Sequence, residues 1–525
     1  MASGTRSHWG KLPLTCASGL GAIFFAIALI PLAASAQAQQ PATQPARGGF
    51  GGGFGRGAAP RPAYIPEGYD DHQNMNEQLG ITKLRPGKSG SNQTGKGFDE
   101  ATANDWMPTL PDVLTMKDGT KVTTAAQWPK RRAEIVEDFE REVYGRIPAN
   151  VPKVTWEVTN TTQADINGIP TVSKTLVGHV DNSAFPQITV NVQASFTVPA
   201  NASGPVPILI EFGGAFGGFG GGAARGGPRG GAGPATQPAN AQRRGGAGPG
   251  GPGANGPIPW TQQALAHGWG YGYLNPGSIQ PDAGGNALRQ GIIGLTTKGQ
   301  PRKPDDWGAL RAWQWGVSRL IDYFEANPDA HVDPKKVGVE GVSRYGKAAV
   351  VAEAFEPRVA VAFVASSGEG GAKLHRHDFG EAVENLTGGE YYWMAGNFIK
   401  YGAAEASFGS KNASDLPVDS HELIALCAPR PCLISYGIES KGDPKWVDAH
   451  GSFMAAILAG PVYKLLGKKD LGTPGDFLKD PMPPVDQLIG GDLAWRQHSG
   501  GHTSVPNFPT FFEWIAAYIP APPAK

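Results

Sequence analysis

The residues best suited to chemistry in this sequence surround Ser343. The segment Lys336-Val-Gly-Val-Glu-Gly341-Val-Ser343-Arg-Tyr-Gly346-Lys347 is typical of a buried strand that runs into a Gly-x-Ser turn, with an Ala-rich helix directly after it. Such a strand, turn and helix form a nucleophile elbow, in which a strained turn raises the serine hydroxyl above a sheet. The second glycine follows the serine by three positions instead of two, so the common Gly-x-Ser-x-Gly spacing is not met. The pattern also suits a serine that merely caps a helix.

A serine needs a general base to become a nucleophile, and His502 is the best-placed histidine. In hydrolases with such an elbow the chain order is serine, then acid, then histidine, which restricts the search to positions after Ser343. His502 follows a predicted strand and a glycine turn in Trp495-Arg-Gln-His498-Ser-Gly-Gly-His502, and a helix is expected over 508–518. His498 is the alternative, but its position favours the strand itself.

The acid that orients the histidine is expected after a strand between these two residues. Pro431-Cys-Leu-Ile-Ser-Tyr-Gly437 is such a strand, and Glu439 and Asp443 lie just beyond it. Either carboxylate could hold the imidazole tautomer and stabilise the imidazolium. Asp448, further along, is a third candidate.

The remaining histidines after Ser343 are interpreted as structural or as substrate contacts. His375 and His377 suggest a metal site, but no cysteine or carboxylate set accompanies them at ligand spacing. We therefore expect no metal and no cofactor. The histidines in this group are His375, His377, His421 and His450.

Strands and helices that alternate from about residue 126 must position these groups. Apolar runs at 206–212, 337–340, 359–364 and 431–436 predict strands, while helical periodicity covers 128–144 and 306–327. Strands separated by helices predict an α/β fold, with a mostly parallel central sheet and helices on both faces. About 400 residues in this region suit one large domain.

Overall charge and the glycine-rich and N-terminal segments indicate the partners, the location and the domain bounds of the protein. The 46 Lys and Arg residues balance the 46 Asp and Glu residues, which argues against a nucleic-acid partner. Residues 1–38 resemble a signal peptide, because basic residues precede a short apolar run and small residues follow it. An uncleaved membrane anchor is the alternative, although the apolar run is short for a helix that spans a bilayer. We expect a secreted or periplasmic protein without membrane association after cleavage, and we expect it to be a monomer. A flexible segment is expected over 39–98, a catalytic domain over 99–525, and a disordered Gly-rich insertion over 213–256. Cys427 and Cys432 could pair or remain free thiols.

Taken together, the motifs resemble the glucuronoyl esterases, carbohydrate esterase family 15, over residues 128–518. The segment Gly341-Val-Ser-Arg-Tyr-Gly-Lys347 matches the family's Gly-x-Ser-Arg-x-Gly-Lys and accounts for the wide glycine spacing. Further matching segments are 306–323, Ser367-Gly-Glu-Gly-Gly-Ala, Phe379-Gly-Glu381, Leu416-Pro-Val-Asp-Ser-His421, Ala428-Pro-Arg-Pro and Gly500-Gly-His502.

The resemblance implies an α/β-hydrolase three-layer sandwich that hydrolyses esters between the glucuronic acid carboxyl of xylan and an alcohol. It implies that Ser343 is the nucleophile, His502 the base, and Arg344 the oxyanion residue through its backbone N–H and guanidinium. Lys347 and Glu381 would hydrogen-bond sugar hydroxyls, and Trp446 would stack near the ring. The substrate would be glucuronoxylan or a lignin–carbohydrate ester.

One feature departs from many family members, which place the acid at the end of the strand that follows the nucleophile. That position here is Ser366, in Ala365-Ser-Ser-Gly-Glu369, so the acid is expected in the later loop at Glu439 or Asp443 rather than at Glu369. Two alternatives stay open at this point. One is an acetylxylan or other carbohydrate esterase on the same fold, and the other is a catalytically weak carbohydrate-binding homologue.

Overall fold

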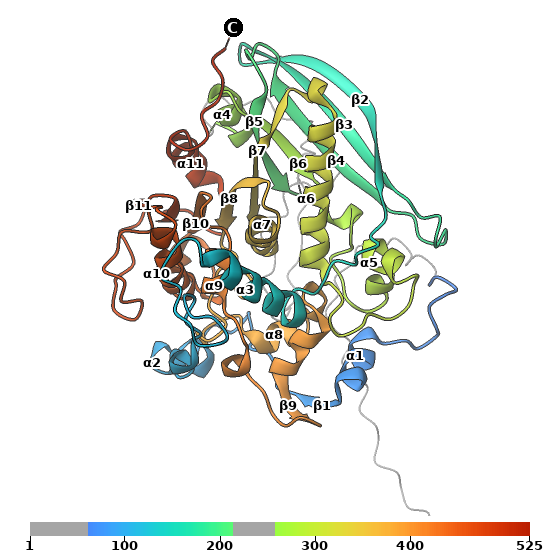
Figure 1. The fold of residues 1–525 in the computed structure, drawn as a ribbon, viewed down its shortest axis with the longest axis vertical. Helices are drawn as coiled ribbons and strands as arrows, with labels where there is room; N and C mark the ends of the chain where they lie inside the picture. The colour runs from blue at the N-terminus through green and yellow to red at the C-terminus, as the bar shows by residue number, and fades with distance from the viewer. Residues whose placement is uncertain (1–60, 214–257, 525) are drawn as a thin grey trace, which may run out of the picture. The chain divides into compact units, whose positions relative to one another are not determined.

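A ten-stranded sheet organises the protein, whose computed structural model describes residues 61–213 and 258–524 (Figure 1). The strand order is β11-β12-β10-β8-β7-β5-β6-β4-β3-β2. The strands β6, β5, β7, β8, β10 and β12 run parallel to one another, and the flanking strands pair antiparallel. The strand bounds are β2 Val154–Ile166, β3 Ile169–Val180, β4 Asn191–Pro199, β5 Val206–Phe212, β6 Gly270–Leu274, β7 Val332–Val342, β8 Val359–Ala365, β10 Cys432–Tyr436, β11 Leu488–Gly490 and β12 Leu493–Gln497.

Helices cover both faces of this sheet because its central strands are apolar on both sides. On β5, for example, Leu209 belongs to one buried cluster and its neighbours Ile208 and Ile210 to another. Alternating residues of a strand point to opposite faces, so both faces need a helical layer. The helices α4 (Trp260–Ala266) and α11 (Phe508–Ile515) lie side by side over one face (Figure 1).

The larger helical layer packs on the other face. The helices are α3 (Trp128–Glu142), α6 (Ala309–Ala326), α7 (Arg344–Phe355), α9 (Ser420–Ala425) and α10 (Ala449–Leu465). The shorter helices are α1 (Asp71–Leu79), α2 (Glu100–Ala103), α5 (Gly291–Thr296) and α8 (Val383–Thr387). The α/β class and the mostly parallel central sheet expected from the sequence are confirmed, and the predicted helix bounds differ by a few residues.

The segment before residue 99 differs from expectation where it is described. Residues 61–98 include α1 and the strand β1 (Ile81–Leu84), which pairs antiparallel with β9 (Ala403–Ala406). Met75 and Ile81 are buried there. The expected flexible segment over 39–98 is thus wrong for residues 61–98, because these apolar side chains belong to the main buried hydrophobic cluster. Residues 39–60, the predicted signal peptide at 1–38 and the insertion from residue 214 lie outside the described residues.

Two further expectations concern the same described residues. None of the helices within 61–213 and 258–524 has both the length and the apolarity to cross a bilayer. Cys427 and Cys432 are buried free thiols rather than a disulfide. Burial raises the pKa of the Cys427 thiol, which keeps it protonated and unreactive at neutral pH.

Every loop that carries a candidate catalytic residue leaves the carboxyl end of a parallel strand. Ser343 follows β7, Ser366 follows β8, Asp443 follows β10 and His502 follows β12. In open α/β sheets, ligands bind in the crevice outside these strand ends. The sheet order therefore brings together groups that are more than 150 positions apart in sequence.

We predict that Gly346→Ala destabilises the fold at the junction of α7 and β8. A Cβ at this position would lie 2.5 Å from the Ala365 carbonyl oxygen, and overpacking of this kind costs about 1–3 kcal/mol. Chemical denaturation measures the free energy of unfolding. The matched control is Gly204→Ala, where a Cβ would meet nothing within 4 Å. Equal stability of the two variants would contradict the predicted close packing.

Candidate active site

Ser343 occupies a strained turn between β7 and α7. Its backbone has φ 62° and ψ −127°, a region that non-glycine residues rarely occupy and that costs of order 1–3 kcal/mol. The Ser343 N–H donates to the Ala365 carbonyl at 2.9 Å, which ties the turn to the end of β8. A side chain on Gly341 would collide with the Tyr345 backbone, and Gly346 passes close to Ala365. These two approaches explain why glycines flank the serine at this spacing.

Asp443 is the carboxylate that contacts His502. Its Oδ1 lies 2.7 Å from His502 Nδ1, and its side chain is 3% exposed. The other oxygen, Oδ2, accepts hydrogen bonds from Ser366 Oγ at 2.7 Å and from the Gly437 N–H at 2.6 Å. The hydrogen bond at Nδ1 leaves His502 Nε2 as the nitrogen available for proton transfer.

The other acids weighed from the sequence lie elsewhere. Glu439 is 59% exposed and lies 3.7 Å from Lys445 Nζ. Asp448 caps α10 and contacts His377. Glu369 is fully buried in ion pairs with Lys373 at 2.8 Å and His375 at 2.5 Å. Of these carboxylates, the structure brings Asp443 to His502.

His498, the alternative histidine, is buried in the wall of the site. Its Nδ1 accepts a hydrogen bond from the Gly500 N–H at 3.0 Å, and burial lowers its pKa. This contact shapes the glycine turn that leads to His502. His498 therefore has a structural position, directly after β12, which ends at Gln497, and not within the strand as the sequence favoured.

Arg344 is the first residue of α7 and lies directly after the nucleophile. Backbone N–H groups in a first helical turn have no intrahelical acceptor and carry partial positive charge. The guanidinium lies 2.5 Å from Asp282 Oδ2, and it lies over the Trp393 ring at 5.3 Å from the centroid. Trp393 Nε1 donates to the same Asp282 carboxylate at 2.8 Å. Asp282 and Trp393 thus fix the Arg344 side chain, which remains 43% exposed.

Lys347 and Glu381 form one buried ion pair. Lys347 Nζ lies 2.8 Å from Glu381 Oε2 and donates to the Ser367 carbonyl at 2.6 Å. The same Glu381 oxygen accepts the Glu369 N–H at 3.0 Å. Both side chains are nearly inaccessible, at 3% and 4% exposed. The pair therefore joins the first turn of α7 to the loop after β8.

Trp446 is held next to Glu381 by the backbone. The Glu381 N–H donates to the Trp446 carbonyl at 2.8 Å, and Gln93 Oε1 accepts the Trp446 N–H at 3.2 Å. Gly90 lies against the indole ring, where an added Cβ would be 3.5 Å away. The segment before residue 99 thus contributes to this wall, which the sequence did not predict.

Glu390 is a further acidic group beside the Lys347–Glu381 pair. Burial raises its pKa to about 8, and the nearby Glu381 carboxylate adds to this effect. The Glu390 carboxyl is therefore largely neutral at pH 7 and can donate a hydrogen bond. Sequence reasoning missed Glu390, Asp282 and Trp393. The aromatic run Tyr391-Tyr-Trp393 was the one available signal, and it pointed to Trp393 alone.

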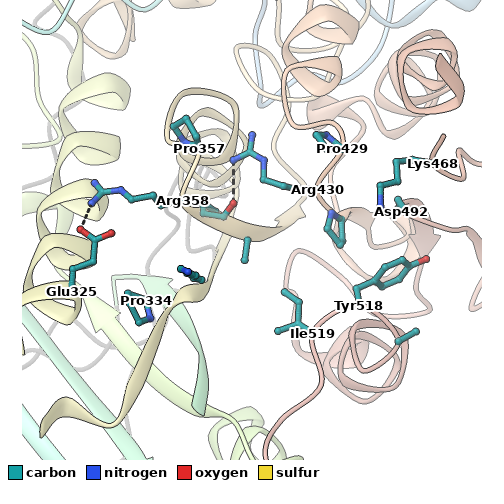
Figure 2. A pocket seen from close by; sticks show the side chains of 15 residues that line it. Glu325, Pro334, Pro357, Arg358, Pro429, Arg430, Lys468, Asp492, Tyr518 and Ile519 are labelled. Atoms are coloured by element: carbon teal, nitrogen blue, oxygen red, sulfur yellow. Dashed lines mark hydrogen bonds and ion pairs between the residues drawn. The ribbon is translucent and has the colours of Figure 1, made fainter. Parts of the chain in front are cut away.

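A separate hollow of about 700 Å³ opens at the other end of the sheet. Figure 2 shows Arg358 and Arg430 at its wall, with Arg358 turned towards Glu325. Pro334, Val359 and Pro431 place it at the amino ends of β7, β8 and β10. Because the nucleophile elbow opens at the carboxyl ends, this hollow is not the candidate active site.

Comparisons with known proteins add independent information. The family model for fungal glucuronyl esterase matches residues 302–467. Carbohydrate esterase MZ0003, from an unknown prokaryotic organism, is 32% identical over 419 residues, which cover 78% of this chain and 88% of that protein. A 4-O-methyl-glucuronoyl methylesterase from Schizophyllum commune is 42% identical over 166 residues, which cover 30% of this chain and 39% of that protein.

Solved structures give the same result over most of the chain. A CE15 glucuronoyl esterase from Teredinibacter turnerae T7901 has a TM-score of 0.70 and 34% identity, covering 85% of this chain and 98% of that chain. A glucuronoyl esterase from Solibacter usitatus has a TM-score of 0.60 and 30% identity, covering 78% of this chain and 97% of that chain.

We predict that the neutral Glu390 carboxyl makes stability fall as pH rises. Its pKa is raised from 4.5 to about 8 in the folded state, so its stabilising contribution is complete below pH 4.5 and is lost towards pH 8. Glu390→Gln keeps a neutral side chain. Relative to wild type, this variant should gain roughly 1–3 kcal/mol between pH 5 and pH 8 in denaturant titrations. The exposed Glu439→Gln is the control, and a parallel pH profile for both variants would contradict the assignment.

Proposed function

Because the chain belongs to the glucuronoyl esterases of carbohydrate esterase family 15, we propose that it uses a serine acyl-enzyme route to cleave esters of (4-O-methyl-)glucuronic acid on xylan. The observation that supports this proposal best is the 2.7 Å contact between the buried Asp443 carboxylate and His502. Both residues follow the strained elbow at Ser343 in chain order. This constellation supplies a nucleophile, a base and an orienting acid. The relatives named methylesterases and glucuronoyl esterases support the substrate class.

In the first half-reaction, His502 Nε2 takes the Ser343 hydroxyl proton as Ser343 Oγ attacks the uronoyl carbonyl carbon. Asp443 stays ionised and stabilises the imidazolium through Nδ1. The tetrahedral oxyanion collapses to an acyl-serine as the ester C–O bond breaks, and His502 gives its proton to the departing alcohol. In the second half-reaction, water attacks the acyl carbon with His502 as base. Ser343 then recovers its proton, and the free glucuronate leaves.

Arg344 is the proposed oxyanion stabiliser. Its backbone N–H at the start of α7 and its adjacent guanidinium supply positive charge where negative charge develops in the transition state. Preorganised donors of this kind contribute several kcal/mol to the transition state. The contacts to Asp282 and Trp393 keep the guanidinium from moving as charge develops.

Lys347, Glu381 and Trp446 are the proposed sugar-binding residues. Lys347 and Glu381 are already paired with each other, so they are preorganised and lose little conformational freedom on binding. Trp446 can offer an apolar ring face to a pyranose, and the neutral Glu390 carboxyl can add a donor. The expected polymeric substrate and the predicted signal peptide favour action outside the cytoplasm. N-terminal sequencing of protein recovered from the culture medium or the periplasm tests this location.

We predict that substitution of Asp443 lowers esterase activity far more than substitution of Glu439. Ser343→Ala should lower kcat/KM for methyl glucuronate by about 10⁴-fold or more, because no nucleophile remains. Asp443→Ala should lower it by roughly 10²–10⁴-fold, because His502 loses its orienting partner. Glu439→Ala removes an exposed carboxylate from the same loop and should leave the rate within about threefold. A larger loss in Glu439→Ala than in Asp443→Ala would overturn the proposed triad.

We predict that the buried ion pair discriminates uronoyl esters from simple acetyl esters. Lys347→Met and Glu381→Gln should lower kcat/KM for methyl glucuronate by roughly 10–100-fold, because each leaves polar groups unpaired at the sugar site. Cleavage of an aryl acetate should fall much less. Lys445→Met, at an exposed lysine beside Trp446, is the matched control. Equal losses on both esters would instead favour an acetyl esterase.

A further inference from the structure

Three side chains from distant parts of the sequence meet next to the sugar-binding wall. Glu100 lies at the start of α2, His377 in the loop before Phe379, and His450 in the first turn of α10. Glu100 Oε2 is 3.3 Å from His377 Nε2 and 3.5 Å from His450 Nδ1. The three potential ligand atoms all lie within 4.8 Å of one another.

A fourth residue, Asp448, orients the buried histidine. Asp448 Oδ2 lies 2.6 Å from His377 Nδ1, and its Oδ1 accepts the Gly451 N–H at 2.9 Å. Both side chains are buried, at 0% and 1% exposed. A carboxylate that accepts a hydrogen bond from the Nδ1–H of a histidine fixes the ring and leaves Nε2 to bind a metal ion. This is how metal-bound histidines are commonly held.

A metal ion in this cluster would take the place of a proton on His377. Burial lowers the pKa of His377, but Asp448 and Glu100 raise it to about 9 overall, so at neutral pH the metal-free ring donates one N–H to each carboxylate. A cation that binds Nε2 displaces this proton and keeps the attraction to the Glu100 carboxylate. Tetrahedral Zn²⁺ with ligands at about 2.0–2.1 Å places neighbouring ligand atoms roughly 3.3–3.4 Å apart. The two distances to Glu100 Oε2 match that separation.

We propose that Glu100, His377 and His450 bind a divalent transition metal ion, Zn²⁺ in the first instance, with Asp448 as the residue that orients His377. Two imidazoles and a carboxylate are a donor set that zinc accepts, and water can complete a tetrahedron. Glu100 is 50% exposed and His450 is 37% exposed, so the ion can enter from solvent. The proposed triad residues contribute no ligand, which makes this a separate site.

The site joins the segment before residue 104 to the wall of the active site. The Asp378 N–H donates to the Ala103 carbonyl at 2.8 Å, and the Gly380 N–H donates to the Gly97 carbonyl at 3.0 Å. Glu381 directly follows Gly380. A bound ion therefore cross-links α2 to the segments that carry Glu381 and Trp446. Its role is to hold this wall together rather than to take part in ester cleavage.

Zinc uptake by the full chain, prepared without a histidine tag and stripped with chelator, tests the proposal. Calorimetric titration and elemental analysis should show one Zn²⁺ per chain, and added Zn²⁺ should raise the unfolding temperature reversibly. His450→Ala and Glu100→Gln should each weaken this uptake at least tenfold. Their unfolding temperatures in chelator should stay near the wild-type value, which separates loss of a ligand from loss of the fold.

His179→Ala is the matched control. His179 is an exposed histidine 2.9 Å from Glu157, with the same pairing of imidazole and carboxylate but no second histidine. This variant should bind zinc like wild type. The proposal is overturned if stripped wild type takes up no stoichiometric zinc, as expected when a proton alone bridges the cluster. It is equally overturned if His450→Ala binds as tightly as wild type, which would indicate adventitious zinc elsewhere.

Discussion

The Asp443 carboxylate is the contact on which the arrangement of the active site depends. One oxygen binds His502, while the other accepts Ser366 Oγ and the Gly437 N–H. These partners follow β12, β8 and β10, so a single buried group joins three strand ends. A buried carboxylate without such partners would cost several kcal/mol, which means that the loops can close only in a geometry that satisfies it. The proposed base, His502, is therefore held in place by a carboxylate that is itself fixed to the strand ends of the sheet.

Charge pairing extends the same constraint to the proposed sugar site. Lys347 lies in the first turn of α7, one turn beyond Ser343. Its ammonium group forms a buried ion pair with Glu381. The carbonyl of Ser367 completes this contact, so the loop after β8 is linked both to the elbow and to the sugar wall. Truncation of one partner leaves the other buried and unpaired, which makes such pairs costly to break. The proposed sugar-binding residues and the proposed nucleophile are therefore held by the same buried contacts.

Residues 61–103 contribute more to the site than the flexible segment expected over 39–98 would. They supply Gly90 and Gln93 to the surroundings of Trp446, and Glu100 to the histidine cluster. Because these contacts lie next to Glu381, order in this segment and order in the proposed sugar site are linked. The proposed zinc ion would strengthen a connection that backbone hydrogen bonds already make.

The sequence by itself determined the α/β class, the elbow at Ser343 and the two carboxylates after β10, because each rests on local periodicity or short spacing. Tertiary structure alone separated Asp443 from Glu439, since the turn after β10 directs one inward to Ser366 and leaves the other in solvent. The meeting of Glu100 with His377, 277 positions later, was equally invisible, because no local pattern encodes contacts across the fold. Spacing can place a residue at a strand end, but burial and packing decide which side chain turns inward.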